Sequence, residues 1–378
     1  MAKDVTYIYG VIASGERMSF GPIGIGGRGD QVHTVPYRDL AAVVSECPLV
    51  DYKAIKDKEK IVRDLAAHQA VIEEVMQRFT ALPMKFGTMV KDQGEVETVL
   101  RQGYFALREA HAAIEDKVEV EVVATWDLPS VFQEISTEEP IARLKAKIEG
   151  VSRLRSVPDR IKVGKLVHES LNRQRENYQQ AVLGALAGCA LDLQKNSLMN
   201  DEMVMNVAFL FDKRQQEAFD RRLDELDEKL GGRLNFRRIG PLPPYSFSTV
   251  EVRPMTHQEV KQAGELLGLG HEASLNEVKR AYYALAQEYH PDAVRLSAHD
   301  EAQPGGKAAD LSAKAQAGER FAQIAAAYQL LSNYCLGQAA AQGITAKKGA
   351  EGYRCSFAPA AIEESILITV RRMGGETL

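Results

Sequence analysis

The hydrophobic pattern of this 378-residue chain changes its period near Pro254, and this change constrains the fold more than any other feature. Before Pro254, short runs rich in β-branched and aromatic residues, such as 5–12 and 203–211, alternate with longer stretches that have apolar residues at three- and four-residue steps. After Pro254 the helical period dominates. This order predicts an α+β region followed by a small, mostly helical module.

The first strand-and-helix region covers residues 1–126 and is expected to be an α+β domain. Strands are expected at 5–12, 32–36, 41–45, 84–90 and 118–126. Amphipathic helices are expected within 52–80 and at 94–116. The Leu82-Pro83 pair should end the first of these helices, because proline cannot continue a helix.

The second region covers residues 127–255 and is expected to be another α+β domain. Its first part, 127–140, contains two prolines and several acidic residues and is expected to be a linker. A long helical stretch at about 141–195, either continuous or broken near Pro158, should be followed by a strand at 203–211, a helix at 213–230, and strands at 234–240 and 245–252.

Residues 256–338 are expected to form the small helical module. Two amphipathic helices are expected, at 275–289 and 319–332, each with its own apolar face. The stretch between them, 293–318, is rich in alanine, glycine and serine and is expected to be a flexible loop. The remaining residues, 339–378, are expected to be a tail with one strand, at 365–371, whose partner the sequence does not identify.

The composition argues against several classes of partner and location. A net charge of −5 gives no global positive field that would attract nucleic acid or an anionic membrane, so neither is an expected partner. No stretch has the length of a membrane span, and the apolar run 5–12 is too short for a signal peptide. The chain is therefore expected in the cytoplasm.

The cysteines give no sign of a metal site or a disulfide framework. Cys47, Cys189, Cys335 and Cys355 are far apart, without a C-x-x-C pair or a nearby histidine pair. A zinc site that uses all four would require long-range folding, and reduced thiols packed as small core residues are the favoured interpretation. No metal ion and no cofactor is expected.

No set of residues in the sequence indicates catalysis. Gly24, Gly26 and Gly29 fit G-x-G-x-x-G, but a strand is expected after them where a phosphate-binding turn needs a helix, so a hairpin loop is favoured. His68 lies in an apolar helix without a nearby catalytic partner and is interpreted as a structural histidine. The chain has no G-x-S-x-G motif. We therefore expect no catalytic residue and no enzymatic activity.

The tripeptide His290-Pro291-Asp292 directly follows the first helix of the module. Its surroundings are LGLGHEASLNEVKRAYYALAQEYHPD from Leu267 and FAQIAAAYQLLS from Phe321. Together these segments resemble the J-domain of DnaJ-type co-chaperones. The resemblance implies that His290, Pro291 and Asp292 contact a DnaK-type chaperone and stimulate its ATPase. The alternative is a retained fold in which the tripeptide only ends a helix.

The module departs from the J-domain pattern in its charges. Lys279 and Arg280 are balanced by Glu277 and Glu288, so the helix has no net charge between residues 274 and 289. Electrostatic steering toward an acidic partner should therefore be weak. The loop after the tripeptide is also long, and Ala293 stands where a basic residue usually follows.

Residues 5–252 carry a second resemblance, which rests on an ordered set of segments. They are YIYGVI from Tyr7, DLAAVVSECPL from Asp39, HQAVIEEVM from His68, LPMKFGTMV from Leu82, VGKLVHESL from Val163, MNVAFLFD from Met205 and GPLPPYSF from Gly240. In this order they resemble the GvpF/GvpL family of gas vesicle proteins, with Lys85 in place of arginine and Leu242 in place of tryptophan. The resemblance implies two α+β domains, the first ferredoxin-like, and a non-catalytic accessory role in gas vesicle formation.

The second resemblance also implies partners: the small shell protein GvpA and other gas vesicle proteins, at the gas vesicle in the cytoplasm. A shell subunit exposes apolar surface before assembly and would aggregate unless that surface were covered. Recruitment of a DnaK-type chaperone by the J-like module is the accompanying hypothesis. Two alternatives stay open: a structural minor component of the vesicle, and a general J-protein co-chaperone. Segments 82–88 and 240–247 are candidate contact surfaces, although structural turns are favoured there.

Overall fold

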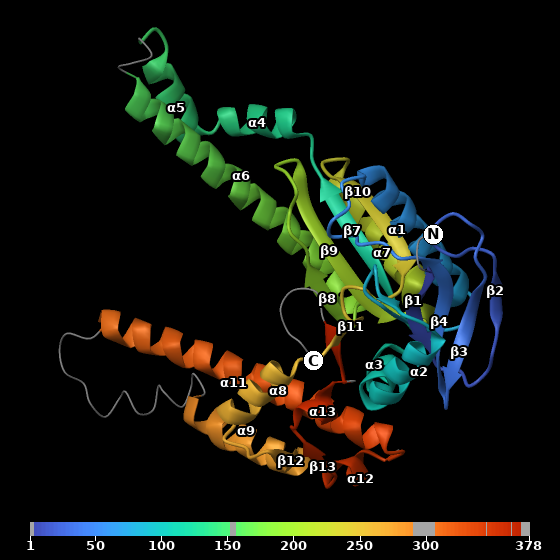
Figure 1. The fold of residues 1–378 in the computed structure, drawn as a ribbon. Helices are drawn as coiled ribbons and strands as arrows, with labels where there is room; N and C mark the ends of the chain where they lie inside the picture. Colours follow the sequence, from blue (N-terminus) through green and yellow to red (C-terminus); the bar gives the residue numbers. More distant parts are fainter. Residues whose placement is uncertain (1–3, 152–155, 290–306, 345, 364, 372–378) are drawn as a thin grey trace. The chain divides into compact units, whose positions relative to one another are not determined.

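The computed structural model describes residues 4–151, 156–289, 307–344, 346–363 and 365–371 (Figure 1). They fall into two compact units, one with residues up to Ala113 together with Ser248–Arg371, and one with Ile114–Phe247. The chain thus leaves the first unit, builds the second and returns to complete the first. The mixed α+β class and the helical character of the C-terminal region are as predicted.

The first unit is built on an antiparallel sheet with the order β2-β3-β4-β1-β5, and β6 also pairs with β1. Its strands are β1 (Asp4–Ile12), β2 (Ser19–Gly21), β3 (Val32–Tyr37), β4 (Leu40–Pro48), β5 (Ala81–Pro83) and β6 (Met89–Val90). In the chain order, strands β2 to β4 come between β1 and the first helix. In a split βαβ unit, by contrast, a helix follows the first strand directly. Almost every residue of β1 is buried, as expected for a strand covered on both faces.

Three helices accompany this sheet: α1 (Lys58–Met76), α2 (Gln93–Gln102) and α3 (Tyr104–Ile114). Helix α1 begins at Asp57, whose side chain accepts a hydrogen bond from the backbone N–H of Lys60. The buried face of α1 packs on the sheet through Ile72 and its neighbours. The single helix predicted at 94–116 is two helices, because Gly103 ends α2 and α3 starts directly after it.

The first unit gains two more strands from the C-terminal part of the chain, β11 (Thr249–Pro254) and β14 (Ile366–Arg371). Strand β11 adjoins the end of β5, since the N–H of Lys85 donates to the Val250 carbonyl at 2.8 Å and Met84 forms a parallel bridge with Val250. Strand β14 pairs with β11 in antiparallel register from Thr249↔Arg371 to Pro254↔Ile366. The strand predicted at 365–371 is therefore confirmed, and its partner is β11.

The helical module contains α8, α9 and α11 with a short C-terminal segment. Its elements are α8 (His257–Leu266), β12 (Glu272–Ser274), α9 (Leu275–Tyr289), α11 (Lys307–Ala341), α12 (Lys347–Glu351), β13 (Arg354–Ser356) and α13 (Pro359–Ile362). Helix α9 has the predicted bounds. Helix α11 begins at Lys307, so the loop prediction is wrong for 307–318, where alanine, the best helix former, favours helix.

The second unit has an antiparallel sheet with the order β10-β7-β9-β8. Its elements are β7 (Lys117–Thr125), α4 (Leu128–Ser136), α5 (Glu139–Ile148), α6 (Val157–Leu186), β8 (Asp192–Lys195), β9 (Met203–Asp212), α7 (Gln216–Leu230) and β10 (Asn235–Leu242). The linker predicted at 127–140 is wrong, because helix α4 occupies most of it. Asp127 caps this helix by accepting from the Ser130 N–H at 3.0 Å, and Pro129 lies in its first turn.

The core of the second unit is dominated by strand β9 and the helices that cover it. Every residue of β9 except Asn206 and Asp212 is buried. Phe219 of α7 stacks on Phe211 with ring centroids 4.8 Å apart. Across all described residues of the chain, no helix has the combination of length and apolarity that crossing a bilayer requires.

Candidate functional site

The helical module is organised around the pair α9 and α11. The ring of Tyr282 stacks on that of Tyr328 at 4.4 Å, and the Cys335 thiol points to the Ala273 carbonyl at 3.9 Å. From Ala273, just before α9, to Tyr282 within it the residue number increases, whereas that of the contacted residue in α11 decreases from 335 to 328. The two helices are therefore antiparallel. The two helices predicted at 275–289 and 319–332 thus lie in a helix hairpin.

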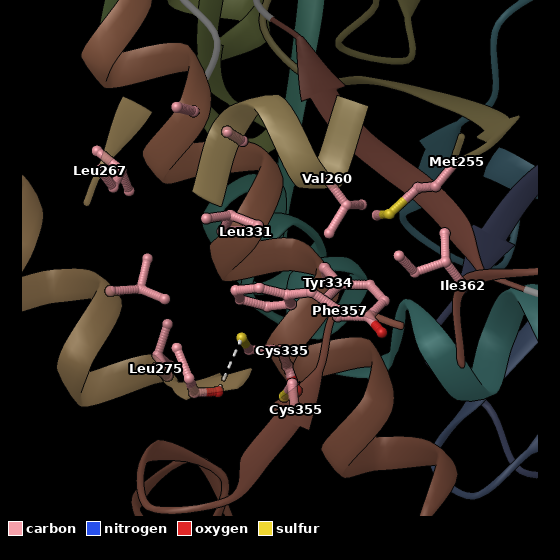
Figure 2. Close-up of a cluster of buried hydrophobic side chains, with 14 of the residues drawn as sticks. Met255, Val260, Leu267, Leu275, Leu331, Tyr334, Cys335, Cys355, Phe357 and Ile362 are labelled. Carbon is pink, nitrogen blue, oxygen red and sulfur yellow. Dashed lines mark hydrogen bonds between the residues drawn. The ribbon is translucent and has the colours of Figure 1, made fainter. Parts of the chain in front are cut away.

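A compact apolar core holds this hairpin, and side chains from the C-terminal segment are part of it (Figure 2). Its labelled members are Met255, Val260, Leu267, Leu275, Leu331, Tyr334, Cys335, Cys355, Phe357 and Ile362. The Tyr334 hydroxyl donates to the Ser356 carbonyl at 2.5 Å, which ties α11 to β13. Cys355, Phe357 and Ile362, from the segment predicted to be a tail, are thus part of the same core as α9 and α11.

The four cysteines are free thiols, three of them buried. Cys335 and Cys355 lie in the core just described, where hydrogen bonding with the Cys355 thiol and then burial raise the pKa of Cys335 well above its usual value. In the described residues, no three His, Cys, Asp or Glu side chains gather in a way that would hold a metal ion.

The predicted partner-contact residues His290, Pro291 and Asp292 lie outside the described residues, so their role stays a prediction. The helix that leads to them is described up to Tyr289. Its first turn is fixed by a reciprocal pair, in which the Glu277 carboxylate accepts from the Ser274 N–H at 2.7 Å and the Ser274 hydroxyl accepts from the Glu277 N–H at 3.3 Å. The helix that precedes the tripeptide is therefore capped at its N-terminus.

Charges on α9 are paired with the C-terminal segment. Lys279 Nζ lies 2.6 Å from a carboxylate oxygen of Glu351, and Glu277 accepts from Arg354 at 3.1 Å. Hydrogen bonds from Ser274, with a further contribution from Arg354, lower the pKa of Glu277 to about 2. Two of the four charges between residues 274 and 289 are therefore engaged within the module.

Strand β14 and its neighbours attach the module to the rest of the first unit. The Ile366 N–H donates to the Gln102 side-chain oxygen at 2.8 Å, and the Asn333 side chain donates to the Ile368 carbonyl at 3.1 Å. Lys347 pairs with Glu109 of α3 at 2.7 Å. The last strand of the described chain thus contacts both the N-terminal helix α2 and the long helix α11.

The segment 82–88 is held by Tyr7 of the central strand. The Tyr7 hydroxyl accepts from the Gly87 N–H at 2.9 Å and lies 3.0 Å from Nδ1 of His68. Burial raises the pKa of Tyr7 and lowers the pKa of His68 to about 4, so the imidazole is neutral at pH 7. His68 is 2% exposed among aromatic rings, which confirms its interpretation as a structural histidine.

The segment 240–247 is anchored in a similar way, by a buried carboxylate. Ser246 donates to Glu119 of β7 twice, from its N–H at 2.8 Å and from its hydroxyl at 2.7 Å. Burial raises the pKa of Glu119 to about 7, although the two bonds from Ser246 favour the charged form. Both motifs therefore have clear structural roles, in agreement with the favoured interpretation of these segments as structural turns.

Glu119 should make the stability of the protein depend on pH. Its folded pKa of about 7 lies above the reference value of 4.5, so its stabilising contribution is complete below pH 4.5 and is lost as pH rises through 7. Between pH 5 and pH 8, the free energy of unfolding of wild type should fall by about 2 kcal/mol more than that of Glu119→Gln. Urea denaturation at both pH values measures this difference. Glu217→Gln, at an exposed position of α7, is the control and should follow wild type.

The fold and the site define a two-unit α+β protein with a helical module of the J-domain type. The model of the family described as "Gas vesicle synthesis protein GvpL/GvpF" matches residues 5–249, and the model of the DnaJ domain matches residues 265–335. The chain belongs to the GvpL/GvpF family of gas vesicle synthesis proteins and carries a DnaJ domain behind the family region.

Individual relatives agree with this assignment. Gas vesicle protein F1 of Halobacterium salinarum is 27% identical over 249 residues, which cover 65% of this chain and 93% of the relative. Gas vesicle protein F of Streptomyces sp. is 28% identical over 245 residues, 64% of this chain and 98% of the relative. The crystal structure of GvpF from Anabaena sp. PCC7120 matches the fold with a TM-score of 0.53 and 24% identity, over 64% of this chain and 97% of that one.

Proposed function

We propose that this protein assists gas vesicle formation by binding the shell protein GvpA in the cytoplasm and keeping it competent for assembly, while its J-like module recruits a DnaK-type chaperone to the bound client. The membership in the GvpL/GvpF family supports the link to gas vesicles. The DnaJ domain in the same chain supports the link to a chaperone.

The observation that carries the proposal is the attachment of the module to the family region. Strand β14 pairs with β11 over six residue pairs, and β11 in turn bonds to Lys85 beside β5. A module joined by a strand pair is held near the N-terminal sheet, unlike one on a flexible linker, whose position would vary with linker length. A chaperone bound by the module would therefore act beside a client held by the family region.

The pairing of β11 with β14 determines which variants are suitable for testing the proposal. A fragment that ends at Pro254 would lose β14 and leave the hydrogen-bonding edge of β11 open, and open edges promote aggregation. Purified full-length protein should therefore be compared with full-length His290→Gln in a pull-down of tagged GvpA. We expect both to retain GvpA, with only wild type stimulating the ATPase of a DnaK-type chaperone.

Three other results would count against the proposal. Failure of the full-length protein to retain GvpA removes the client. Stimulation of the chaperone without GvpA binding favours a general J-protein. Tight co-purification with intact, washed vesicles, together with unchanged vesicle yield in His290→Gln, favours a structural component of the vesicle.

A further inference from the structure

Helices α5 and α6 form an antiparallel hairpin in the second unit (Figure 1). It is fastened at both ends, because Lys147 pairs with Asp159 at 3.0 Å and Glu138 binds Arg173 at 3.0 Å and the Ser170 hydroxyl. The residues of α6 that make these bonds share one helix face with the half-buried Val163, Leu166 and Val167, so this face is turned toward α5. The first half of α6 contains the VGKLVHESL motif. Gly164 and His168 of this motif are exposed and lie on the opposite face of the helix.

The opposite face of the same half of α6 presents an apolar stripe to solvent. Positions 157, 161, 164 and 168 are spaced i, i+4, i+7 and i+11 and therefore share one face. Val157 is 45% and Ile161 57% exposed, unusual values for aliphatic side chains. Gly164 follows on this face, and a Cβ placed there would meet no atom within 4 Å. The backbone of α6 is thus open to close approach at the centre of the stripe.

The hairpin is also strongly basic in an acidic protein. Residues 139–168 contain eight Lys or Arg against three Asp or Glu, a net charge of +5, whereas the whole chain has −5. Lys165 is exposed on α6 at the edge of the stripe, Lys162 is exposed about 60° further around the helix, and Lys145 is exposed on α5. Within the described part of the chain, none of these three lysines has a carboxylate within 4 Å. Among the described residues, their charge is therefore not neutralised by an ion pair.

We propose that the face of α6 formed by Val157, Ile161, Gly164 and His168, with Lys162 and Lys165 beside it, binds an acidic amphipathic helix of a partner protein. Apolar residues of that helix would cover Val157 and Ile161, and the absence of a side chain at Gly164 lets the two backbones approach. Its flanking carboxylates would face Lys162 and Lys165, which speeds association and selects acidic partners. The proposal is independent of GvpA binding and of the J-like module.

The composition of this face favours a protein helix over other anionic partners. Helices that insert into a bilayer surface carry bulky Trp, Phe or Leu on the apolar face, whereas this stripe offers one Val, one Ile, a Gly and a His. Single-stranded nucleic acid is bound by stacking on aromatic rings, and residues 139–168 contain no Phe, Tyr or Trp.

The test uses the full-length protein and a fluorescein-labelled 18-residue helical peptide with leucines at i, i+4, i+7 and i+11 and glutamates around them. Fluorescence anisotropy at 50 mM salt should show saturable binding, weaker by at least tenfold at 300 mM salt. Lys162→Glu/Lys165→Glu should weaken binding at least tenfold, and Ile161→Ser about fivefold. Arg221→Glu/Lys229→Glu on α7 changes the net charge equally and should bind like wild type.

Each of the contrary outcomes overturns the proposal. Equal binding by wild type and the Lys162/Lys165 variant places the peptide elsewhere. Unchanged peptide binding by Ile161→Ser would show that the interaction is only non-specific charge attraction. Binding to vesicles with 30% phosphatidylserine that depends on Lys162 and Lys165, without binding to the peptide, assigns the surface to a membrane. Self-association in sedimentation velocity that the same variant abolishes, again without peptide binding, assigns it to a second copy of this chain.

Discussion

Replacing His290 by glutamine should reduce stimulation of a DnaK-type ATPase at least tenfold, since the loss of one central contact residue commonly costs a protein interface that much. The thermal midpoint of unfolding should stay within about 1 °C, because every residue of the core in Figure 2 is unchanged. Single-turnover ATP hydrolysis by the chaperone, with and without the variant, measures the first effect. Differential scanning fluorimetry measures the second.

His271→Gln is the matched control for this substitution. His271 is an exposed histidine of the same module, on the segment between α8 and β12, and its backbone carbonyl accepts from the Phe357 N–H. The control should stimulate the chaperone like wild type. Equal activity of wild type, the control and His290→Gln would show that the tripeptide only ends a helix, and would remove the chaperone from the proposed function.

Introducing an alanine at Gly103 should destabilise the first unit by about 2 kcal/mol, because over-packing forces side chains or backbone to move. A Cβ on Gly103 would overlap the Cδ1 atom of Ile368 and come within 2.9 Å of the Val99 carbonyl oxygen. Ile368 is 3% exposed in strand β14, and Ile368→Ala alone should cost about 2–4 kcal/mol. In the double variant the alanine at 368 makes room for the new methyl group, so the two costs should fall short of additivity by about 1 kcal/mol.

Urea unfolding of the wild type, both single variants and the double variant measures this coupling. Gly264→Ala is the control, because the added Cβ in α8 would lie in ordinary contact with Phe357 at 3.5 Å and alanine favours helix over glycine. It should leave stability unchanged or raise it by up to about 1 kcal/mol. Strict additivity of the Gly103 and Ile368 substitutions would contradict the packing of α2 against β14.

The sequence predicts an element well when side chains within that element determine its type and its bounds. Helix α9 begins where its apolar period predicts, since Ser274 and Glu277 form a local cap at its start. The buried strand β9 is recognisable from its continuous apolar run. Both elements follow from side chains within about 15 residues of each other, which is the range that a sequence pattern reports.

Two predictions, the linker at 127–140 and the loop at 307–318, were wrong because the same residue types occur both in loops and in helices. Pro129 and Pro140 suggested a linker, yet each lies in the first turn of a helix, where the missing N–H costs nothing. The alanines after Lys307 suggested flexibility in company with glycine and serine, yet they continue helix α11. Composition alone does not separate these cases, because the helical outcome depends on what the helix packs against.

The features that matter most for the site are contacts between distant parts of the chain. Glu119 alternates with valines in β7 and has the pattern of a residue that faces water, but Ser246 lies over it, 127 positions further along. The strand at 365–371 is visible in the sequence, but its pairing with β11 is not, because pairing depends on what comes together in space. The tripeptide is the reverse case, since its sequence context identifies it but it follows Tyr289 directly and lies outside the described residues.

The return of the chain to its first unit has a consequence for synthesis on the ribosome. Residues 114–247 are contiguous and can fold as soon as they have emerged, since domains generally fold as units during translation. The N-terminal sheet, in contrast, gains β11 only after residue 254 and β14 only after residue 371 has been made, so a strand edge stays open through most of translation. One strand edge is therefore still open after the J-like module has been translated, and it closes only when β14 pairs with β11.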